Sequence, residues 1–198
     1  MLVGMLDTTS SVDWKQQLVA QLQWHWDGQL RPRLAGMEDA EYHWEPVADC
    51  WGVRRRAPGL AGEQQPGTDE WTCDFSYPEP DPPPVTTIAW RVAHLAVGVF
   101  GARAQSHFGA TFDGGPADYQ QWAFARTAAD GLRQLDATYT AWIDGARSLS
   151  ADDLLRQVGE AEGPWAEHSM AELVLHISRE AIHHGAEISL LRDLYGRQ

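Results

Sequence analysis

Hydrophobic residues recur at helical spacing in four stretches of the chain. The first runs from about Ser11 to Leu34, behind the N-cap candidates Ser10 and Ser11. The second begins near Val85, directly after a run of prolines, and continues to about Phe108. It is apolar nearly all round, as a central helix would be. We predict two further helices, over roughly Ala117–Ser148 and about Ser169–Tyr195.

The segment between the first two predicted helices has a different composition. Residues 37–46 are acidic and have room for one helical turn before Pro46. From Cys50 to Pro84 the chain is rich in Gly, Pro and aromatic residues, and the run PEPDPPP excludes both a helix and a central strand. Alternation with a period of two at 51–53 and at 71–77 indicates a small hairpin. We therefore expect a long ordered loop that covers one end of the helices.

Four long helices without a competing strand pattern predict an all-α protein. A chain of 198 residues with 43% hydrophobic content can bury one substantial core. The expected architecture is a single domain, residues 1–198, folded as an antiparallel four-helix bundle with the long loop between helices 1 and 2.

The net charge and the N-terminal sequence indicate which binding partners and which cellular location to expect. The formal net charge of -13 argues against binding to nucleic acid or to an anionic membrane surface, because both need clustered Lys and Arg. The N-terminal residues lack a basic segment and reach Asp7 before any long apolar run, which is unlike a secretory signal. No apolar stretch is long enough for a conventional membrane span. We expect a cytoplasmic protein, in which Cys50 and Cys73 are free thiols of unassigned role.

The last predicted helix carries an acid and an imidazole on its inner face. A turn of about 100° per residue places His184 within the apolar stripe of this helix, and Glu180 lies at the margin of the stripe. Residues at i and i+4 lie close together, so Glu180 and His184 can share one ion. His183 falls on the flank with His176 and Glu187.

A third ligand must come from another helix, and His94 is the candidate. The second predicted helix is otherwise almost devoid of titratable side chains, and the face of His94 also holds Trp90, Gly98 and Gly101. The two glycines leave space for a ligand or let another helix approach closely. A buried carboxylate and buried imidazoles are costly unless they are paired or bind a metal.

Simpler interpretations stay open at this point. A Glu-x3-His pair is often an exposed ion pair, and a lone His in a buried helix is usually a hydrogen-bonded core residue. His183 is either a supporting or proton-transfer group or a flank ion-pair partner of Glu187. Arg91 and Arg179 are either receptors for carboxylates or solvated surface arginines.

Four segments carry a family resemblance that extends over nearly the whole chain. They are Glu41-Tyr42-x-Trp44-Glu45-Pro46, Cys50-Trp51-x-Val53-Arg54, Thr87-Ile88-Ala89-Trp90-Arg91-x-Ala93-His94 and Ile182-His183-His184-Gly185-Ala186-Glu187-Ile188. In these residues and in their order the chain resembles actinobacterial members of the DinB/YfiT-like metalloenzymes, which include the mycothiol-dependent maleylpyruvate isomerases.

The resemblance implies a metal site and its ligands. The first histidine of the family pattern matches His94. The final helix of most members offers His-x3-His, whereas the maleylpyruvate isomerase branch uses Glu-x3-His, which here is Glu180 and His184. The resemblance thus implies that these three residues bind a divalent metal, zinc or nickel, together with a low-molecular-weight thiol such as mycothiol or bacillithiol.

Two imidazoles and one carboxylate leave coordination positions open, as a catalytic metal requires. A thiol bound there would be held as a thiolate at neutral pH, ready to attack an electrophilic carbon. We expect a metal-dependent thiol S-transferase or thiol-assisted isomerase that acts on a small electrophilic substrate. Two alternatives stay open: a non-enzymatic, stress-related metal-binding or interaction protein with a structural or vestigial site, and a metallohydrolase, which would need a general base. Association into a homodimer is also open.

Overall fold

The computed structural model describes residues 12–58, 65–76, 78 and 80–198. Within them the chain is mostly helical, as expected for the all-α class, with one small two-stranded sheet. The helical elements are α1 (Trp14–His25), η1 (Trp26–Leu30), α2 (Arg31–Arg33), α3 (Asp39–Tyr42), α4 (Ile88–Ala93), η3 (His94–Gly101), α5 (Ala102–Phe108), α6 (Ala128–Ser148), α7 (Ala151–Leu155), η4 (Glu160–Trp165) and α8 (Met170–Tyr195).

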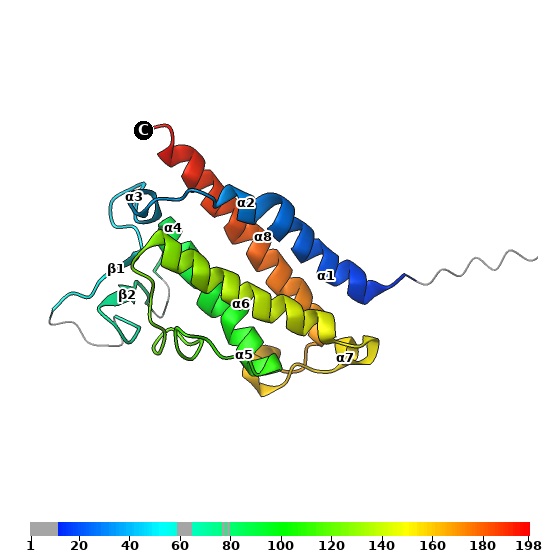
Figure 1. Cartoon of the computed structure of the whole chain (residues 1–198). Helices are drawn as coiled ribbons and strands as arrows, with labels where there is room; N and C mark the ends of the chain where they lie inside the picture. The colour runs from blue at the N-terminus through cyan, green and yellow to red at the C-terminus, as the bar shows by residue number, and fades with distance from the viewer. Residues whose placement is uncertain (1–11, 59–64, 77, 79) are drawn as a thin grey trace, which may run out of the picture.

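The long helical segments lie side by side and enclose the core (Figure 1). The segments α1–η1–α2 and α4–η3–α5 are each continuous, and η1 and η3 are wider π-helical turns within them. α6 packs on η3, and α8 packs on α1. Trp26 stacks flat on Tyr139 with 3.8 Å between ring centroids, which joins η1 to α6 across the core. The largest side chains buried in this interior include Trp122, Trp142, Tyr42, Phe100, Leu22, Leu95, Leu135 and Ile177.

The predicted second and fourth helices begin within one turn of the observed helices. Thr87 accepts a hydrogen bond from the Trp90 amide and caps α4. Ser169 and Glu172 form a reciprocal capping box at the start of α8. The first helix begins at Trp14 behind the cap Asp13. The predicted caps Ser10 and Ser11 lie outside the described residues.

The predicted start of the third helix at Ala117 is wrong, because α6 begins only at Ala128. Residues 117–127 form an irregular segment that turns Trp122 and Phe124 into the core, where they are 1% and 4% exposed. Two large apolar residues two positions apart suit such a segment better than one face of a helix. The Trp122 indole donates to Gln134 Oε1 at 3.1 Å, which attaches the segment to α6.

The small hairpin predicted in the long loop is present. The strands β1 (Val53–Arg55) and β2 (Trp71–Cys73) pair antiparallel, with Val53 opposite Cys73. Trp51 lies outside this pair and forms a parallel bridge with Thr86. Tyr77, at the end of the predicted alternation, lies outside the described residues. Cys50 and Cys73 are both buried and free, as expected.

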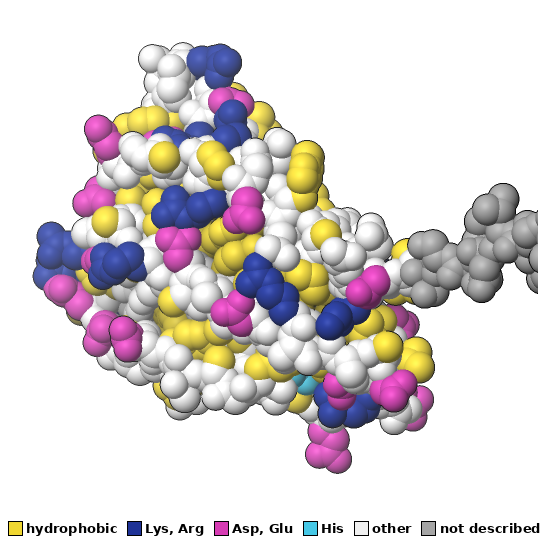
Figure 2. Space-filling view, turned by 45° about the vertical axis from the view of Figure 1, so that its right-hand side comes forward, with side chains coloured by type: hydrophobic (Ala, Val, Ile, Leu, Met, Phe, Trp, Pro, Cys, Tyr) yellow, Lys and Arg dark blue, Asp and Glu magenta, His cyan; other side chains and the backbone are white. Residues whose placement is uncertain are grey.

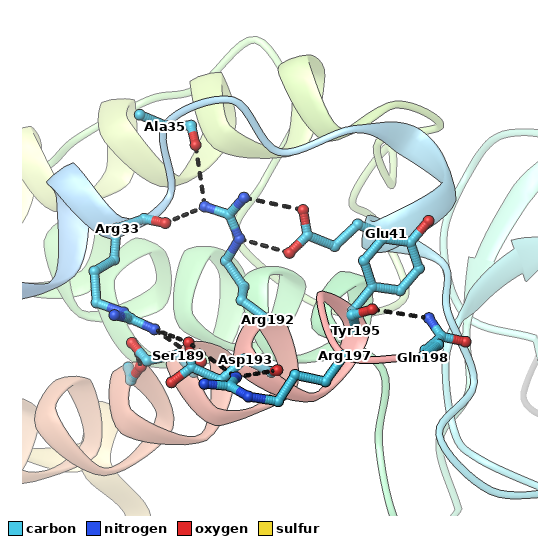
Figure 3. Close-up of polar contacts among 10 residues, drawn as sticks. Arg33, Ala35, Glu41, Ser189, Arg192, Asp193, Tyr195, Arg197 and Gln198 are labelled. Carbon is cyan, nitrogen blue, oxygen red and sulfur yellow. Dashed lines mark hydrogen bonds and ion pairs between the residues drawn. The ribbon is translucent and has the colours of Figure 1, made fainter.

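The short helix α3 confirms the helical turn predicted before Pro46, and a buried ion pair attaches it to α8. Arg192 donates from Nε to Glu41 Oε1 at 2.6 Å and from Nη2 to Oε2 at 3.0 Å. Figure 3 shows the same guanidinium reaching the backbone carbonyls of Arg33 and Ala35. Glu41 is 6% exposed, so this two-pronged contact compensates a buried carboxylate. The contact fixes α3, which precedes the long loop, against the C-terminal part of α8.

Two short elements that the sequence did not predict, α7 and η4, connect α6 to α8. Glu162 of η4 accepts hydrogen bonds from His107 at 2.9 Å and from Arg103 at 3.1 Å, and both donors belong to α5.

Among the described residues, no helix combines the length and the apolar character that crossing a membrane requires. Figure 2 shows basic and acidic side chains interspersed with hydrophobic ones on one face of the molecule.

Candidate metal centre

The structure brings His94, Glu180 and His184 together. One potential ligand atom from each of the three residues lies within 4.8 Å of the others. His184 Nε2 is 3.3 Å from Glu180 Oε2, and the two imidazole rings meet edge to face with 4.7 Å between centroids. His94 opens the π-helical segment η3, whereas Glu180 and His184 come from adjacent turns of α8. The site thus lies where these two segments pack together.

His94 is held on two sides. Its ring stacks on Trp90, one turn earlier, with 5.1 Å between centroids and 11° between planes. Its Nδ1 lies 2.7 Å from the Tyr119 hydroxyl. Burial, together with the nearby His184, Arg91 and Arg103, lowers the pKa of His94 to about 3. The imidazole is therefore neutral near pH 7, and when Nδ1–H donates to Tyr119, Nε2 carries a free lone pair.

Gly98 and Gly101 are needed for close packing and leave no space for a ligand at the faces they present. A Cβ on Gly98 would lie 2.8 Å from the Tyr119 hydroxyl oxygen. A Cβ on Gly101 would lie 2.5 Å from the Ala96 carbonyl oxygen and 3.3 Å from Thr138 of α6. Gly101 therefore lets α6 approach closely, as one of the two sequence-based interpretations expected, whereas Gly98 makes room for Tyr119 of the irregular segment and not for another helix.

Glu187 and Arg91 both contact Nδ1 of His184 and orient its ring. Its Nδ1 lies 2.7 Å from Glu187 Oε2, and Arg91 Nε lies 3.0 Å from the same oxygen. Arg91 Nη1 is also 3.1 Å from Nδ1. Because a guanidinium only donates and a carboxylate only accepts, Nδ1 can satisfy one of these two neighbours at a time. Donation from Nδ1–H to Glu187 leaves Nε2 of His184 free to bind a cation.

The remaining predicted residues lie around this centre. Arg91 is 18% exposed and paired with Glu187, so it is no solvated surface arginine. His183 is 66% exposed, and its Nε2 lies 3.4 Å from Glu187 Oε1, which matches the flank ion pair. His183, His184 and Glu187 also form a grouping with metal-ligand spacing. In that grouping the Arg91 guanidinium already compensates the Glu187 carboxylate, so the cluster with His94 is the stronger candidate.

The cluster of His94, Glu180 and His184 fits a divalent cation in its donor chemistry and nearly in its geometry. Neutral imidazole nitrogens and a carboxylate are suitable ligands for zinc and similar metals. Bonds of about 2 Å in a tetrahedron place neighbouring ligand atoms about 3.3 Å apart. The pair His184–Glu180 already has a separation of 3.3 Å. Small rotamer changes within the 4.8 Å cluster would complete the arrangement.

Sequence reasoning missed two contributors to this centre. Tyr119 lies in the segment that was wrongly predicted as the start of the third helix, and no periodic signal connects it to His94. Glu187 was assigned to the flank with His183, but it follows His184 by three residues and therefore shares a helix face with it. The three-residue spacing between His184 and Glu187 could therefore have indicated this contact from the sequence.

Comparison with known proteins supports the resemblance seen in the sequence at the level of the superfamily. The family model described as DinB superfamily matches residues 21–188, which include all three residues of the candidate centre. Searches of curated proteins and of solved structures returned no match. Since the family model covers most of the chain, this protein belongs to the DinB superfamily, whose members in general bind metal.

Proposed function

We propose that His94, Glu180 and His184 bind one divalent cation, zinc or nickel. We further propose that the centre serves a thiol-dependent S-transferase or isomerase. The partners would be a small-molecule thiol of the mycothiol type and an electrophilic substrate. In this proposal the long helical segments form the antiparallel four-helix bundle expected from the sequence.

The observation that carries the proposal is the convergence of two imidazoles and one carboxylate from two packed helical segments. The low pKa of His94 keeps its ring neutral, and a neutral ring is the form that binds a metal. Three protein ligands leave a coordination position open, which distinguishes a catalytic metal from a closed structural one.

Residues around the centre would hold the ligands in place. With Nδ1–H of His94 donating to Tyr119 and Nδ1–H of His184 donating to Glu187, Nε2 of both rings would be free to bind the cation. Trp90 covers one face of the His94 ring and restricts its rotation. When bound, the cation would lower the pKa of a coordinated thiol and keep it as a nucleophilic thiolate near neutral pH.

The thiol in this proposal comes from outside the chain. Cys73 is fully buried, and burial raises the pKa of its thiol well above the ordinary value. Cys50 is 2% exposed, and its thiol donates to the Val47 carbonyl at 2.9 Å. Neither cysteine is therefore placed to attack a substrate.

The test is turnover of an electrophile with added thiol. Metal-loaded protein is assayed with mycothiol and two electrophiles: maleylpyruvate for isomerisation and monochlorobimane for S-transfer. We expect turnover in the wild type and in the exposed control Glu167→Ala. We expect its loss in His94→Ala and His184→Ala variants whose circular dichroism shows that they fold. Equal turnover in all four proteins contradicts the proposed site, and metal binding without any turnover favours the non-enzymatic alternative.

A further inference from the structure

A cavity of about 450 Å³ lies beside the N-terminal half of α8. Its walls include Leu173, His176 and Arg179 of α8, Glu162 and Trp165 of η4, Arg103 of α5, and the connecting residues Val158 and His168. A volume of this size is typical of sites for small organic molecules. α5 is far in sequence from η4 and α8, and the contacts of Glu162 with α5 keep η4 in place as one wall.

The cavity borders the candidate metal centre. His176, which lines the cavity, has its Nδ1 3.9 Å from Glu180 Oε1. Arg103, which also lines the cavity, donates to the carbonyl of Gly98 in η3, the segment that His94 opens. A molecule in this cavity would therefore lie next to the centre.

The charges in the cavity wall leave one cation without a partner. Glu162 is compensated by Arg103 and His107, and the carboxylate of Glu172 is held by the N-terminal cap of α8 and by His168. Arg179 is exposed and makes no hydrogen bond or ion pair with any residue in the described part of the chain. An unpaired guanidinium beside two compensated carboxylates favours an anionic ligand.

The cavity lining also contains exposed apolar side chains. Trp165 is 59% exposed and Leu175 is 40% exposed, and both line the cavity. Large apolar side chains that gather at a cavity lose unfavourable contact with water when an apolar molecule covers them. The ligand that suits this wall therefore combines an anionic group with an apolar or aromatic body.

We propose that this cavity binds a small organic carboxylate with an apolar or aromatic body, in which the carboxylate pairs with Arg179 and the body packs against Trp165. Its assignment as the electrophilic co-substrate of the metal centre rests on the proposed function. The carboxylate binding itself does not.

The experiment is calorimetric titration with phenylacetate as the probe and phenylacetamide as its neutral counterpart, in the presence of a chelator. We expect the wild type to bind phenylacetate more tightly than phenylacetamide. Arg179→Gln should weaken phenylacetate binding about fivefold to tenfold and leave phenylacetamide unchanged, because a single charge-assisted contact is lost. Trp165→Ala should weaken both probes. The matched control Arg133→Gln, on α6 and outside the cavity lining, should bind like the wild type.

Two results would overturn the proposal: no phenylacetate binding by the wild type, or equal phenylacetate binding by Arg179→Gln and the wild type. The His94→Ala variant separates this proposal from the proposed function. If His94→Ala still binds phenylacetate and the wild type holds no metal, the cavity proposal stands and the metal proposal fails. If the wild type holds metal and does not bind phenylacetate, the metal proposal stands and the cavity proposal fails.

Discussion

Two side chains outside the predicted trio determine how its imidazoles point. Tyr119 contacts Nδ1 of His94 at 2.7 Å, and Glu187 contacts Nδ1 of His184 at 2.7 Å. Each contact fixes a ring orientation, and the acceptor-only carboxylate of Glu187 favours the His184 tautomer with Nε2 free. Metal affinity should therefore depend on both residues, although neither offers a ligand atom to the cluster of His94, Glu180 and His184.

The Tyr119→Phe variant tests this dependence at the residue scale. It keeps the ring that packs against Gly98 and removes only the hydroxyl that contacts His94. We expect zinc affinity to fall about tenfold, because loss of a supporting hydrogen bond typically costs 10- to 100-fold. Competition with a chromophoric chelator measures the change. Tyr195→Phe, at the C-terminal end of α8, is the control, and an affinity of Tyr119→Phe equal to that of the wild type would contradict the assigned role.

The sequence, partly through the family resemblance, predicted that His94, Glu180 and His184 would lie together, but it did not single out Tyr119 and Glu187 as their supports. The spacing of Glu180 and His184 places both on one helical face, and His94 stood out in a helix with few titratable groups. Tyr119 reaches the site from an irregular segment, where side-chain direction depends on tertiary contacts that no local pattern records.

At the scale of elements, hydrophobic periodicity predicted the positions of the long helices. It failed for residues 117–127, a loop whose apolar side chains pack into the core. α8 and α4 begin at the capping residues Ser169 and Thr87, whose side chains satisfy free backbone amides. Residues 117–127 carry apolar side chains but are not helical. Their backbone amides and carbonyls form hydrogen bonds with other loops and with α5. One such bond joins the Ala117 amide to Gln105 Oε1 at 3.0 Å.

The attachment of η4 to α5 should depend on pH through Glu162. The hydrogen bond from His107, with the charge of Arg103, lowers the pKa of Glu162 below 4.5. A carboxyl with a lowered folded-state pKa stabilises the protein above its unfolded pKa, and this stability is lost as pH falls through the folded value. We expect Glu162→Gln to be about 2 kcal/mol less stable than the wild type at pH 7.

The difference between these two proteins should narrow below pH 4.5, where protonation removes the advantage of the carboxylate. Urea unfolding at a series of pH values gives both free energies. A difference that stays constant from pH 7 to pH 3 would show that Glu162 contributes by packing and not by its charge.

The ion pair between α3 and α8 should contribute strongly to stability. Arg192→Met leaves the Glu41 carboxylate buried without its partner, because Glu41 is 6% exposed. We expect the free energy of unfolding to fall by about 3 kcal/mol, the cost typical of breaking a buried pair on one side. Denaturant unfolding measures it. Arg197→Met is the matched control, since Arg197 and Asp193 are exposed and 4.0 Å apart, and it should change the free energy by less than about 0.5 kcal/mol.

At the scale of the whole molecule, the sequence predicted the helical character, the hairpin in the long loop and the meeting of His94 with α8. Helical periodicity, caps and turn residues are local signals and predicted the first two, whereas the meeting of His94 with α8 also drew on the family resemblance. The cavity beside α8 depends on η4, which no periodic pattern predicted, and on the contacts of Glu162 with α5. Chemistry that depends on the packing of a short element against a distant helix is visible only in the fold.

The most direct test of the account is the metal content of the purified protein. After incubation with zinc and removal of excess, the wild type and the exposed control Glu167→Ala should retain close to one equivalent per chain by atomic emission. Glu180→Ala should lose most of it, because the carboxylate is one of only three proposed ligands. Equal zinc in Glu180→Ala and the wild type would contradict the proposed centre.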